Sequence, residues 1–150
     1  MVQGENKNII TKIDNDGNYI FARCKKILEK GNEYKWKIKI LKSEYNKINI
    51  GVAYTNSSDI DLSKAYKFGW FLYCKDLKFY SGPPHNYNYE KSGLKTLKDE
   101  IIVNMDMKQG ILKFIIGEES GFISDIPLEQ NLVPVVTLFN EGDSVQIIKC

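Results

Sequence analysis

The chain of 150 residues has the length of about one domain, which is enough to bury a hydrophobic core. Its net charge of +2 is close to neutral and no apolar run approaches the length of a membrane span, so neither a nucleic-acid-binding nor a membrane-bound protein is favoured. Three cysteines without C-x-x-C spacing, together with the absence of a secretory leader, predict free thiols and an intracellular location, cytoplasmic or nuclear.

The N-terminal segment predicts a short disordered edge followed by a hairpin. Residues 1–8 are expected to be disordered, and residues 9–150 are expected to form a single domain. Residues 9–13 and 19–21 have the composition of two strands, and the Asp16-Gly17 pair between them is a strong turn signal. We therefore predict that these two strands pair with each other.

Two half-buried strands are expected next. Between residues 34 and 40, aromatic and aliphatic residues alternate with lysines, which indicates one buried face and one solvated face. Trp36 is accordingly predicted to lie in the core. Residues 48–52 predict the following strand, in which Gly51 indicates a close approach of two backbones.

The hairpin with the clearest turn chemistry lies between residues 101 and 116. Residues 101–107 have period two, with apolar side chains on one face and Asn104 and Asp106 on the other. A tight turn follows in which Gly110 is expected to adopt positive φ, and Asp106 is expected to hydrogen-bond the backbone of that turn. Another strand is predicted near residues 132–138, ending in a polar turn.

Strand-like runs recur along the whole chain, and no segment sustains a helical period. The best helical candidate, residues 59–67, would form only one or two turns. The residue pattern therefore predicts an all-β fold, a two-sheet antiparallel β-sandwich.

The C-terminal half resembles a SPRY domain. Residues 104–114, N-M-D-M-K-Q-G-I-L-K-F, are similar to the D-M-D-x-G-T-L-S-F hairpin of that family. Residues 132–145, L-V-P-V-V-T-L-F-N-E-G-D-S-V, are similar to its Y-P-A-V-S-L strand and the turn that follows.

The resemblance continues upstream in the same order. Residues 31–40, G-N-E-Y-K-W-K-I-K-I, resemble the G-x-x-Y-W-E-V-x-V strand, and residues 50–53 match I-G-V-A. Residues 69–73, G-W-F-L-Y, and 77–80, L-K-F-Y, resemble G-W-x-L-Y followed by K-L-Y-H. The five motifs cover about residues 31 to 148 and imply a SPRY, or concanavalin-like jelly-roll, type of sandwich.

The resemblance implies a non-catalytic protein-interaction module without a cofactor. In the family the strands form a rigid scaffold, and loops at one end form a shallow pocket for a short peptide or a partner surface. Such modules act in the substrate-recognition part of ubiquitin ligases and in other multidomain proteins, and fold resemblance does not choose among these settings. A monomer that binds a protein or peptide, and neither nucleic acid nor membrane, is expected.

Carried over by position, the family pocket has seven members in this chain. They are Arg23, Cys24, Tyr54, Tyr66, Phe139, Asn140 and Glu141. Arg23 is expected to bind a carboxylate or carbonyl of the partner, and Asn140 to pair with its backbone. Tyr54 and Phe139 would supply aromatic walls. Asn140 stands next to a position where the family often has a bulky aromatic, and Phe71 occupies one that is often small or polar, so the neighbouring surface is expected to differ.

The residues give little support to catalysis. The single histidine, His85, lies in a polar loop, and the chain has no phosphate loop, dinucleotide fingerprint or nucleophile elbow. A second class of function stays open, a lectin-like domain that binds glycans. Its candidate contacts to sugar hydroxyls and ring faces are the asparagines and tyrosines of residues 86–89.

Overall fold

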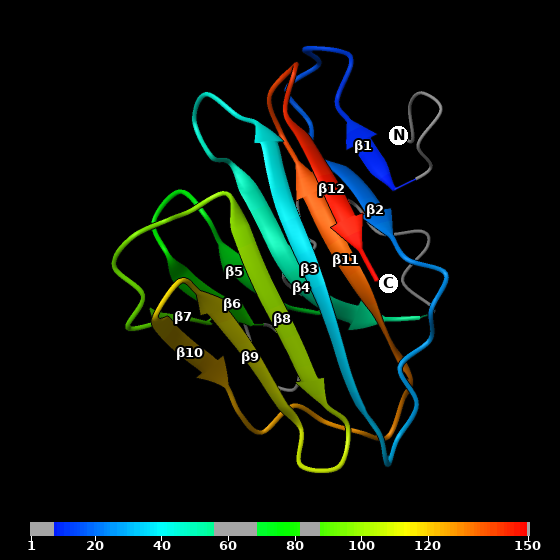
Figure 1. The fold of residues 1–150 in the computed structure, drawn as a ribbon. Helices are drawn as coiled ribbons and strands as arrows, with labels where there is room; N and C mark the ends of the chain where they lie inside the picture. The colour runs from blue at the N-terminus through cyan, green and yellow to red at the C-terminus, as the bar shows by residue number, and fades with distance from the viewer. Residues whose placement is uncertain (1–7, 56–68, 82–87, 150) are drawn as a thin grey trace.

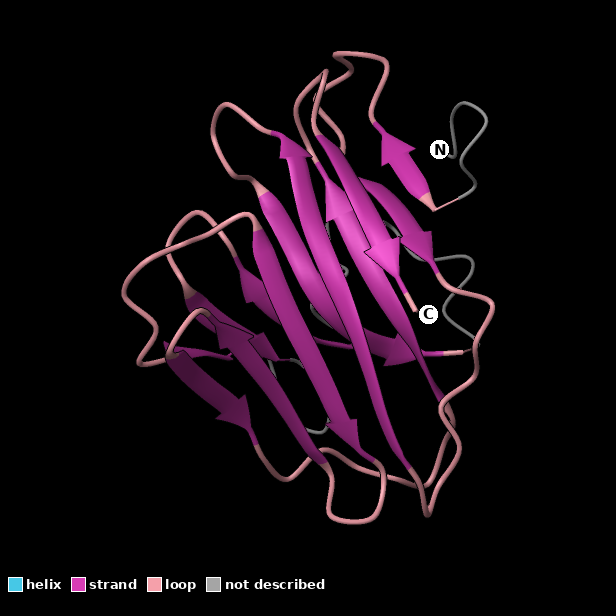
Figure 2. Cartoon of the chain, in the orientation of Figure 1, coloured by secondary structure: helices cyan, strands magenta, loops and turns pink. Residues whose placement is uncertain are grey.

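The computed structural model describes residues 8–55, 69–81 and 88–149, and in these ranges every regular element is a β-strand. The strands form two antiparallel sheets of six strands each, packed as two layers (Figures 1 and 2). The first sheet has the order β1 (Ile9–Thr11), β12 (Ser144–Ile148), β3 (Glu33–Lys42), β8 (Glu100–Asp106), β9 (Ile111–Ile116) and β10 (Glu119–Ile123). The second has the order β2 (Ile20–Arg23), β11 (Leu132–Leu138), β4 (Ile48–Tyr54), β5 (Gly69–Tyr73), β6 (Lys78–Ser81) and β7 (Asn88–Lys91).

The predicted two-sheet antiparallel sandwich is therefore confirmed. The described residues include no helix with the length and apolarity of a membrane span. The expected disordered edge falls mostly on residues 1–7, and the helical candidate at 59–67 also lies outside the described residues.

The core lies between the sheets and is filled by alternate side chains of the strands. In β3, Trp36 and Ile38 are buried while the lysines between and beside them lie on the outer side. Trp36 is paired with Val103 of β8, which is also buried, and residues of both sheets belong to one continuous apolar cluster. The alternation seen in the sequence thus corresponds to the buried and solvated faces of the sheet.

The β8–β9 hairpin has the turn that its sequence predicts. Gly110 has a φ of +72°, and its N–H donates to the carbonyl of Asp106 at 2.9 Å. The Asp106 carboxylate accepts from the N–H groups of Lys108 (2.8 Å) and Gln109 (3.1 Å). A Cβ at position 110 would also lie 2.4 Å from the carbonyl oxygen of Ile126, so glycine is required both by φ and by space.

The N-terminal strands do not form the predicted hairpin. β1 pairs with β12 in the first sheet, whereas β2 pairs with β11 in the second. Gly17 has the positive φ expected for the turn, +76°, but the segment from Lys12 to Tyr19 carries the chain from one sheet to the other. We call it the crossing segment. A turn signal fixes a local change of direction and leaves the strand partners undetermined.

Pro134 determines where β2 ends. The Cys24 N–H donates to the Pro134 carbonyl at 3.0 Å, just beyond the last β2–β11 pair, Arg23 with Val135. In antiparallel strands the N–H and C=O of one residue face the same neighbour, so Pro134 lacks the donor that would continue this ladder. The chain leaves as residues 24–32, which we call the strap, and Leu28 is held to Leu132 by two backbone hydrogen bonds of 2.8 and 3.4 Å.

The outer side of the second sheet holds a smaller apolar cluster. Phe71 lies between the inward-facing Trp70 and Leu72 of β5, so its ring is on the opposite side, where it packs with Ala53, Val133 and Val135. Phe71 is 1% exposed and is therefore part of this cluster and not of an open surface. At Gly51, a Cβ would lie 1.9 Å from the Trp70 carbonyl oxygen, which confirms the close backbone approach.

The cysteines differ from the prediction of free thiols in one respect. Cys74 is free and buried, and burial raises the pKa of its thiol to about 12, so this thiol stays protonated. Cys24 is disulfide-bonded, and the expectation of a free thiol is wrong for this residue. Sequence spacing could not show this, because a disulfide depends on which cysteines the fold brings close together.

Candidate functional site

The predicted pocket residues fall into two groups, and the first contains Arg23 and Tyr54. The Arg23 guanidinium donates to the carbonyl of Thr55 at 2.6 Å, so it links the end of β2 to the end of β4. Tyr54 is half-buried and stacks edge-on against Trp70, with ring centroids 5.5 Å apart. Cys24 is half-buried beside this group, whereas Tyr66 lies outside the described residues.

The second group, Phe139 to Glu141, follows the other end of β11. Phe139 packs on Tyr19 with a centroid distance of 4.7 Å, and the Lys47 ammonium lies 4.9 Å from the Phe139 ring centroid. Asn140 belongs to the turn itself, since its N–H donates to the Asp143 carboxylate at 2.9 Å. The amide oxygen of Asn140 is buried, so it is not displayed to a partner, while Glu141 is exposed.

The prediction that these residues converge around one pocket must be corrected. Tyr54 is paired with Leu132 at the beginning of β11, and Phe139 follows Leu138 at its end. At roughly 3.3 Å per residue the two levels are about 20 Å apart. Arg23 is directed toward Thr55 and so belongs with Tyr54. The described members therefore form two separate sites, and a binding role for either remains a prediction.

The Phe139 group is part of a longer aromatic surface that sequence reasoning missed. Tyr73 of β5 shares a side-chain hydrogen bond with Tyr19, and its ring lies edge-on to Tyr80 of β6, with centroids 5.8 Å apart. The Tyr80 hydroxyl donates to the Asp76 carboxylate at 2.7 Å. We call this set the tyrosine row. Its members are Tyr19, Phe139, Tyr73 and Tyr80, all half-buried.

Strand alternation could have identified part of the tyrosine row. Because Leu72 and Phe79 face the core, Tyr73 and Tyr80 must face outward on neighbouring strands. The proximity of Tyr19 and Phe139 could not be identified in this way, since it depends on the pairing of β2 with β11. Burial, followed by the hydrogen bond with Tyr19, raises the pKa of the Tyr73 hydroxyl, which stays neutral and able to donate a hydrogen bond.

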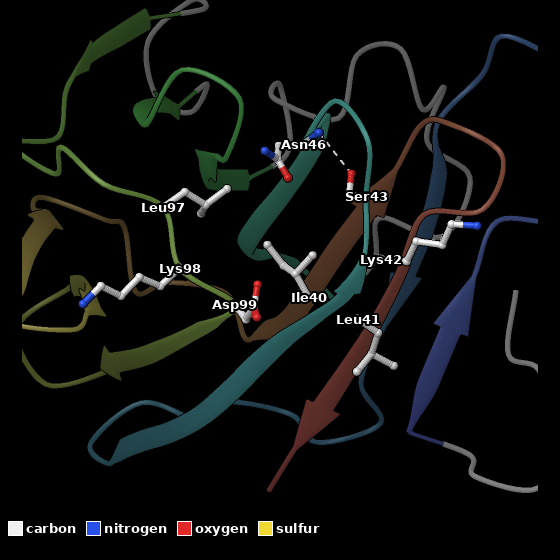
Figure 3. Close-up of a pocket in the computed structure, with 8 residues that line it drawn as sticks. All are labelled: Ile40, Leu41, Lys42, Ser43, Asn46, Leu97, Lys98 and Asp99. Carbon is white, nitrogen blue, oxygen red and sulfur yellow. Dashed lines mark hydrogen bonds between the residues drawn. The ribbon is translucent and has the colours of Figure 1, made fainter.

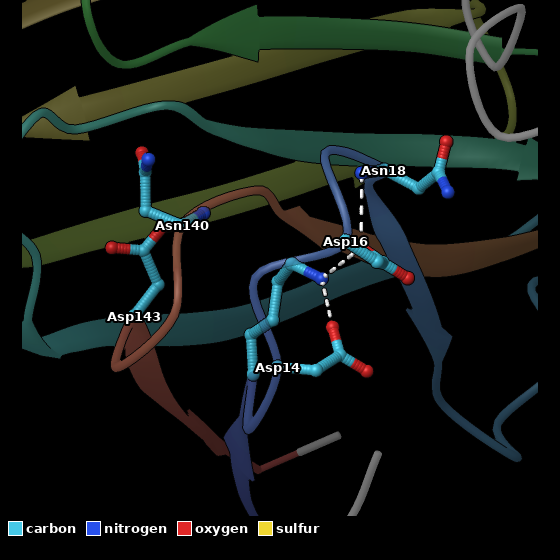
Figure 4. Close-up of polar contacts among 6 residues, drawn as sticks. Asp14, Asp16, Asn18, Asn140 and Asp143 are labelled. Atoms are coloured by element: carbon cyan, nitrogen blue, oxygen red, sulfur yellow. Dashed lines mark hydrogen bonds and ion pairs between the residues drawn. The ribbon is translucent and has the colours of Figure 1, made fainter.

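Polar contacts hold the crossing segment against the turn that carries Phe139. The Lys12 side chain is fully buried, and its ammonium contacts the carboxylates of Asp14 (2.6 Å) and Asp16 (2.8 Å). Lys12 also exchanges backbone hydrogen bonds with the β11–β12 turn, to the Asp143 carbonyl at 2.9 Å and from the Gly142 N–H at 2.8 Å. Figure 4 shows Asp14, Asp16 and Asn18 on the crossing segment and Asn140 and Asp143 on that turn. These contacts fix the positions of the two segments that carry Tyr19 and Phe139 of the tyrosine row.

We call Lys12, Asp14 and Asp16 the Lys12 clamp, and the opposite charges of Lys12 and Asp16 stabilise each other. Burial alone would lower the pKa of Lys12, but the hydrogen bonds and charges of Asp14 and Asp16 raise it overall. The hydrogen bond from Lys12 lowers the pKa of Asp16 from 3.8 to about 2, with help from the Asn18 N–H. Lys12 and Asp16 are therefore both charged over the whole neutral range.

The described surface has hollows at several places, and two of them concern the predicted site and its surroundings. One, of about 420 Å³, is lined by residues 40–43, Asn46 and residues 97–99, and Figure 3 shows it between the end of β3 and the segment before β8. Within it, the Ser43 hydroxyl is engaged by the fold, because it donates to the Asp143 carboxylate at 2.8 Å. The other, of about 270 Å³, lies where the strap, β3 and Pro134 meet.

No group of three or more His, Cys, Asp or Glu side chains within residues 8–55, 69–81 and 88–149 is arranged to hold a metal ion. His85, Asn86 and Tyr87 lie outside these ranges, and Asn88 and Tyr89 are described only as backbone of β7. The predicted glycan contacts therefore stay a sequence-based expectation.

No protein-family model and no curated protein matches this sequence. Solved SPRY domains are similar in structure. The SPRY domain of human HERC1 is 20% identical with a TM-score of 0.76, covering 99% of this chain and 91% of that one. A human SPRY domain is 15% identical with a TM-score of 0.68, covering 95% and 92%, and the TRIM65 PSpry domain is 14% identical with a TM-score of 0.63, covering 87% and 71%. These likenesses show that the chain has the SPRY fold, as its sequence motifs predicted.

Proposed function

We propose that this SPRY-fold chain is a non-catalytic protein-interaction module and that the tyrosine row is its principal recognition surface. The observation that carries the proposal is the grouping of four half-buried aromatic side chains on one end of a rigid sheet. Aromatic rings with a polar tip supply large contact areas at low entropic cost, and tyrosine is enriched at the centres of protein interfaces.

The scaffold suits this role because polar contacts hold the segments that carry Tyr19 and Phe139 in place. The Lys12 clamp and the Asp143 contacts position the crossing segment and the β11–β12 turn before any partner arrives. A preorganised surface loses less conformational entropy on binding than a loop that must first be ordered. The Arg23 and Tyr54 group is proposed as a second, separate contact at the opposite end of β11.

The wider setting is also part of the proposal. The SPRY resemblance implies an intracellular domain, monomeric by itself, that recognises a protein or peptide for a larger protein, and substrate recognition within a ubiquitin ligase is one such setting. No cofactor, nucleic acid or membrane is required for this role.

Two matched phenylalanine variants test the recognition surface. Phe139→Ala removes one ring of the tyrosine row, whereas Phe122→Ala removes the aromatic ring that is 59% exposed on β10 of the other sheet. Tagged chains are used to capture partners from lysate, and captured proteins are quantified by mass spectrometry. Phe139→Ala is expected to reduce specific partners by about tenfold, as for a central interface anchor, while Phe122→Ala retains them.

The same experiment can contradict the proposal. If both variants capture the same partners as the unmodified chain, recognition lies elsewhere on the molecule. Circular dichroism of each variant confirms that the fold is intact. A glycan array on which the chain binds sugars, combined with no specific protein capture, would favour the lectin-like alternative.

A further inference from the structure

The hollow at the strap, which we call the strap pocket, differs chemically from the rest of the surface. Leu28 of the strap and Pro134 of β11 give it an apolar wall, and Tyr34 and Trp36 of β3 give it aromatic ones. Leu28 is held by its backbone hydrogen bonds to Leu132, and the Tyr34 hydroxyl accepts from the Glu29 N–H at 3.1 Å. The strap is thus fixed at two points, and the pocket is part of the folded structure.

Trp36, one of the residues that line this pocket, has an unsatisfied donor. Its side chain is 3% exposed, and the indole Nε1–H is buried without an acceptor among the described residues. Buried polar groups in native proteins are nearly always hydrogen-bonded, so an exception requires a physical explanation. Because an indole N–H can only donate, a ligand that satisfies it must bring an acceptor.

The charge around the strap pocket selects the kind of acceptor. Three lysines line it, namely Lys26, Lys35 and Lys149, and no acidic residue does. In the part of the chain that the structure describes, none of these three ammonium groups has a carboxylate within salt-bridge distance, and the Lys26 ammonium lies 5.7 Å from the Tyr34 ring centroid. An anionic acceptor would therefore gain from several uncompensated positive charges.

We propose that the strap pocket binds the side-chain carboxylate of a glutamate in an acidic peptide, with one oxygen accepting from the Trp36 Nε1–H. The lysines that line the pocket supply positive charge near the carboxylate, and the methylene groups of the glutamate pack on Leu28 and Pro134. Lysine can also bind phosphate as a point charge, but the apolar wall of Leu28 and Pro134 matches the methylene groups of a glutamate side chain, which a free phosphate lacks. The inference rests on the proposed function as an interaction module and names the chemistry of its partner.

Nuclear magnetic resonance of the ¹⁵N-labelled chain can test this contact directly. The chain has two tryptophans, so the indole region contains two signals, and Trp36→Phe identifies which belongs to Trp36. Titration with a tetraglutamate peptide is expected to move the Trp36 indole signal downfield, as a new hydrogen bond requires. The matched tetraglutamine peptide is expected to leave it in place, and the Trp70 signal should not move with either.

Charge-reversal variants then locate the binding. Lys26→Glu is expected to weaken tetraglutamate binding by about tenfold or more, whereas Lys113→Glu, at an exposed site on β9, should leave it within about twofold. If Lys26→Glu alters the fold, the milder Lys149→Gln replaces it and should weaken binding in the same direction. A Trp36 indole signal that does not respond to tetraglutamate would overturn the inference.

Further outcomes separate this inference from the proposed function. If inorganic phosphate moves the Trp36 signal as far as tetraglutamate at equal concentration, the pocket is a general anion site, and the acidic-peptide inference is overturned. If the signal does not respond but Phe139→Ala still loses captured proteins, the interaction module stands and only the strap pocket fails. If the Trp36 signal does not respond to tetraglutamate and Phe139→Ala captures the same proteins as the unmodified chain, both proposals are wrong.

Discussion

The β8–β9 hairpin and the crossing segment each contain a turn with a glycine at positive φ, yet they are stabilised in different ways. In the hairpin the flanking strands pair with each other, and the turn is closed by Asp106, four residues before Gly110. In the crossing segment the flanking strands belong to different sheets, and the local ion pairs of Lys12 are joined by backbone hydrogen bonds to the β11–β12 turn far along the chain. A turn motif thus predicts the local backbone geometry in both regions. It predicts strand pairing only in the β8–β9 hairpin, where the two strands that flank the turn pair with each other.

The largest loss of stability is expected from a substitution in β3, the strand that pairs with β8 of the hairpin. Trp36→Ala removes a nearly fully buried ring opposite Val103 of β8 and should lower the free energy of unfolding by about 3 to 5 kcal/mol, from lost burial and the cavity left behind. Chemical denaturation measures this change. Tyr45→Ala, at a side chain that is 53% exposed, should change stability by less than about 0.5 kcal/mol. Equal melting of the Trp36 variant and the unmodified chain would contradict the core assignment.

An intermediate effect should distinguish the two glycine turns. Gly110→Val introduces a β-branched residue at positive φ and also places its Cβ against the Ile126 carbonyl. Gly17→Val meets nothing within 4 Å, so it carries only the φ strain, about 1 to 2 kcal/mol. We expect Gly110→Val to be the more destabilising of the two in urea unfolding. If both lose the same stability, the steric contact at Ile126 plays no part, and the contrast between the regions is weaker than proposed.

The smallest effect concerns the charged contacts of the crossing segment. The folded-state pKa of Asp16, about 2, lies below its ordinary value of 3.8, so the ionised carboxylate stabilises the fold above about pH 4. This contribution is lost as the pH falls toward 2. Asp16→Asn should therefore melt at a lower temperature than the unmodified chain at pH 6, and the difference should shrink toward pH 2 and vanish below it. The effect will be small because the side chain is about half exposed.

A matched control shows whether this pH dependence belongs to the clamp. Glu118→Gln removes an exposed carboxylate on the turn between β9 and β10. Its melting temperature should follow that of the unmodified chain across the same pH range. An equal response of the two variants would indicate a general charge effect and no specific contact between Lys12 and Asp16.

The success and failure of the sequence-based predictions have a common physical reason. The Trp36 core position, the Gly110 turn and the role of Asp106 were predicted correctly, because each depends on residues within a few positions of one another. The shared pocket of Tyr54 and Phe139 was not, because the antiparallel register with β11 places them at opposite ends of that strand. Family position alone carried no information about this separation.

The all-β class, most strand positions and the SPRY resemblance could be predicted from the sequence, since alternation, turn residues and short motifs are local properties of the chain. Three features required the three-dimensional structure. β1 and β2 join different sheets, Tyr19 lies beside both Phe139 and Tyr73, and the buried Trp36 Nε1–H has no acceptor among the described residues. These features arise from contacts between distant segments, and such contacts follow from sheet order and register, which depend on how the whole core packs.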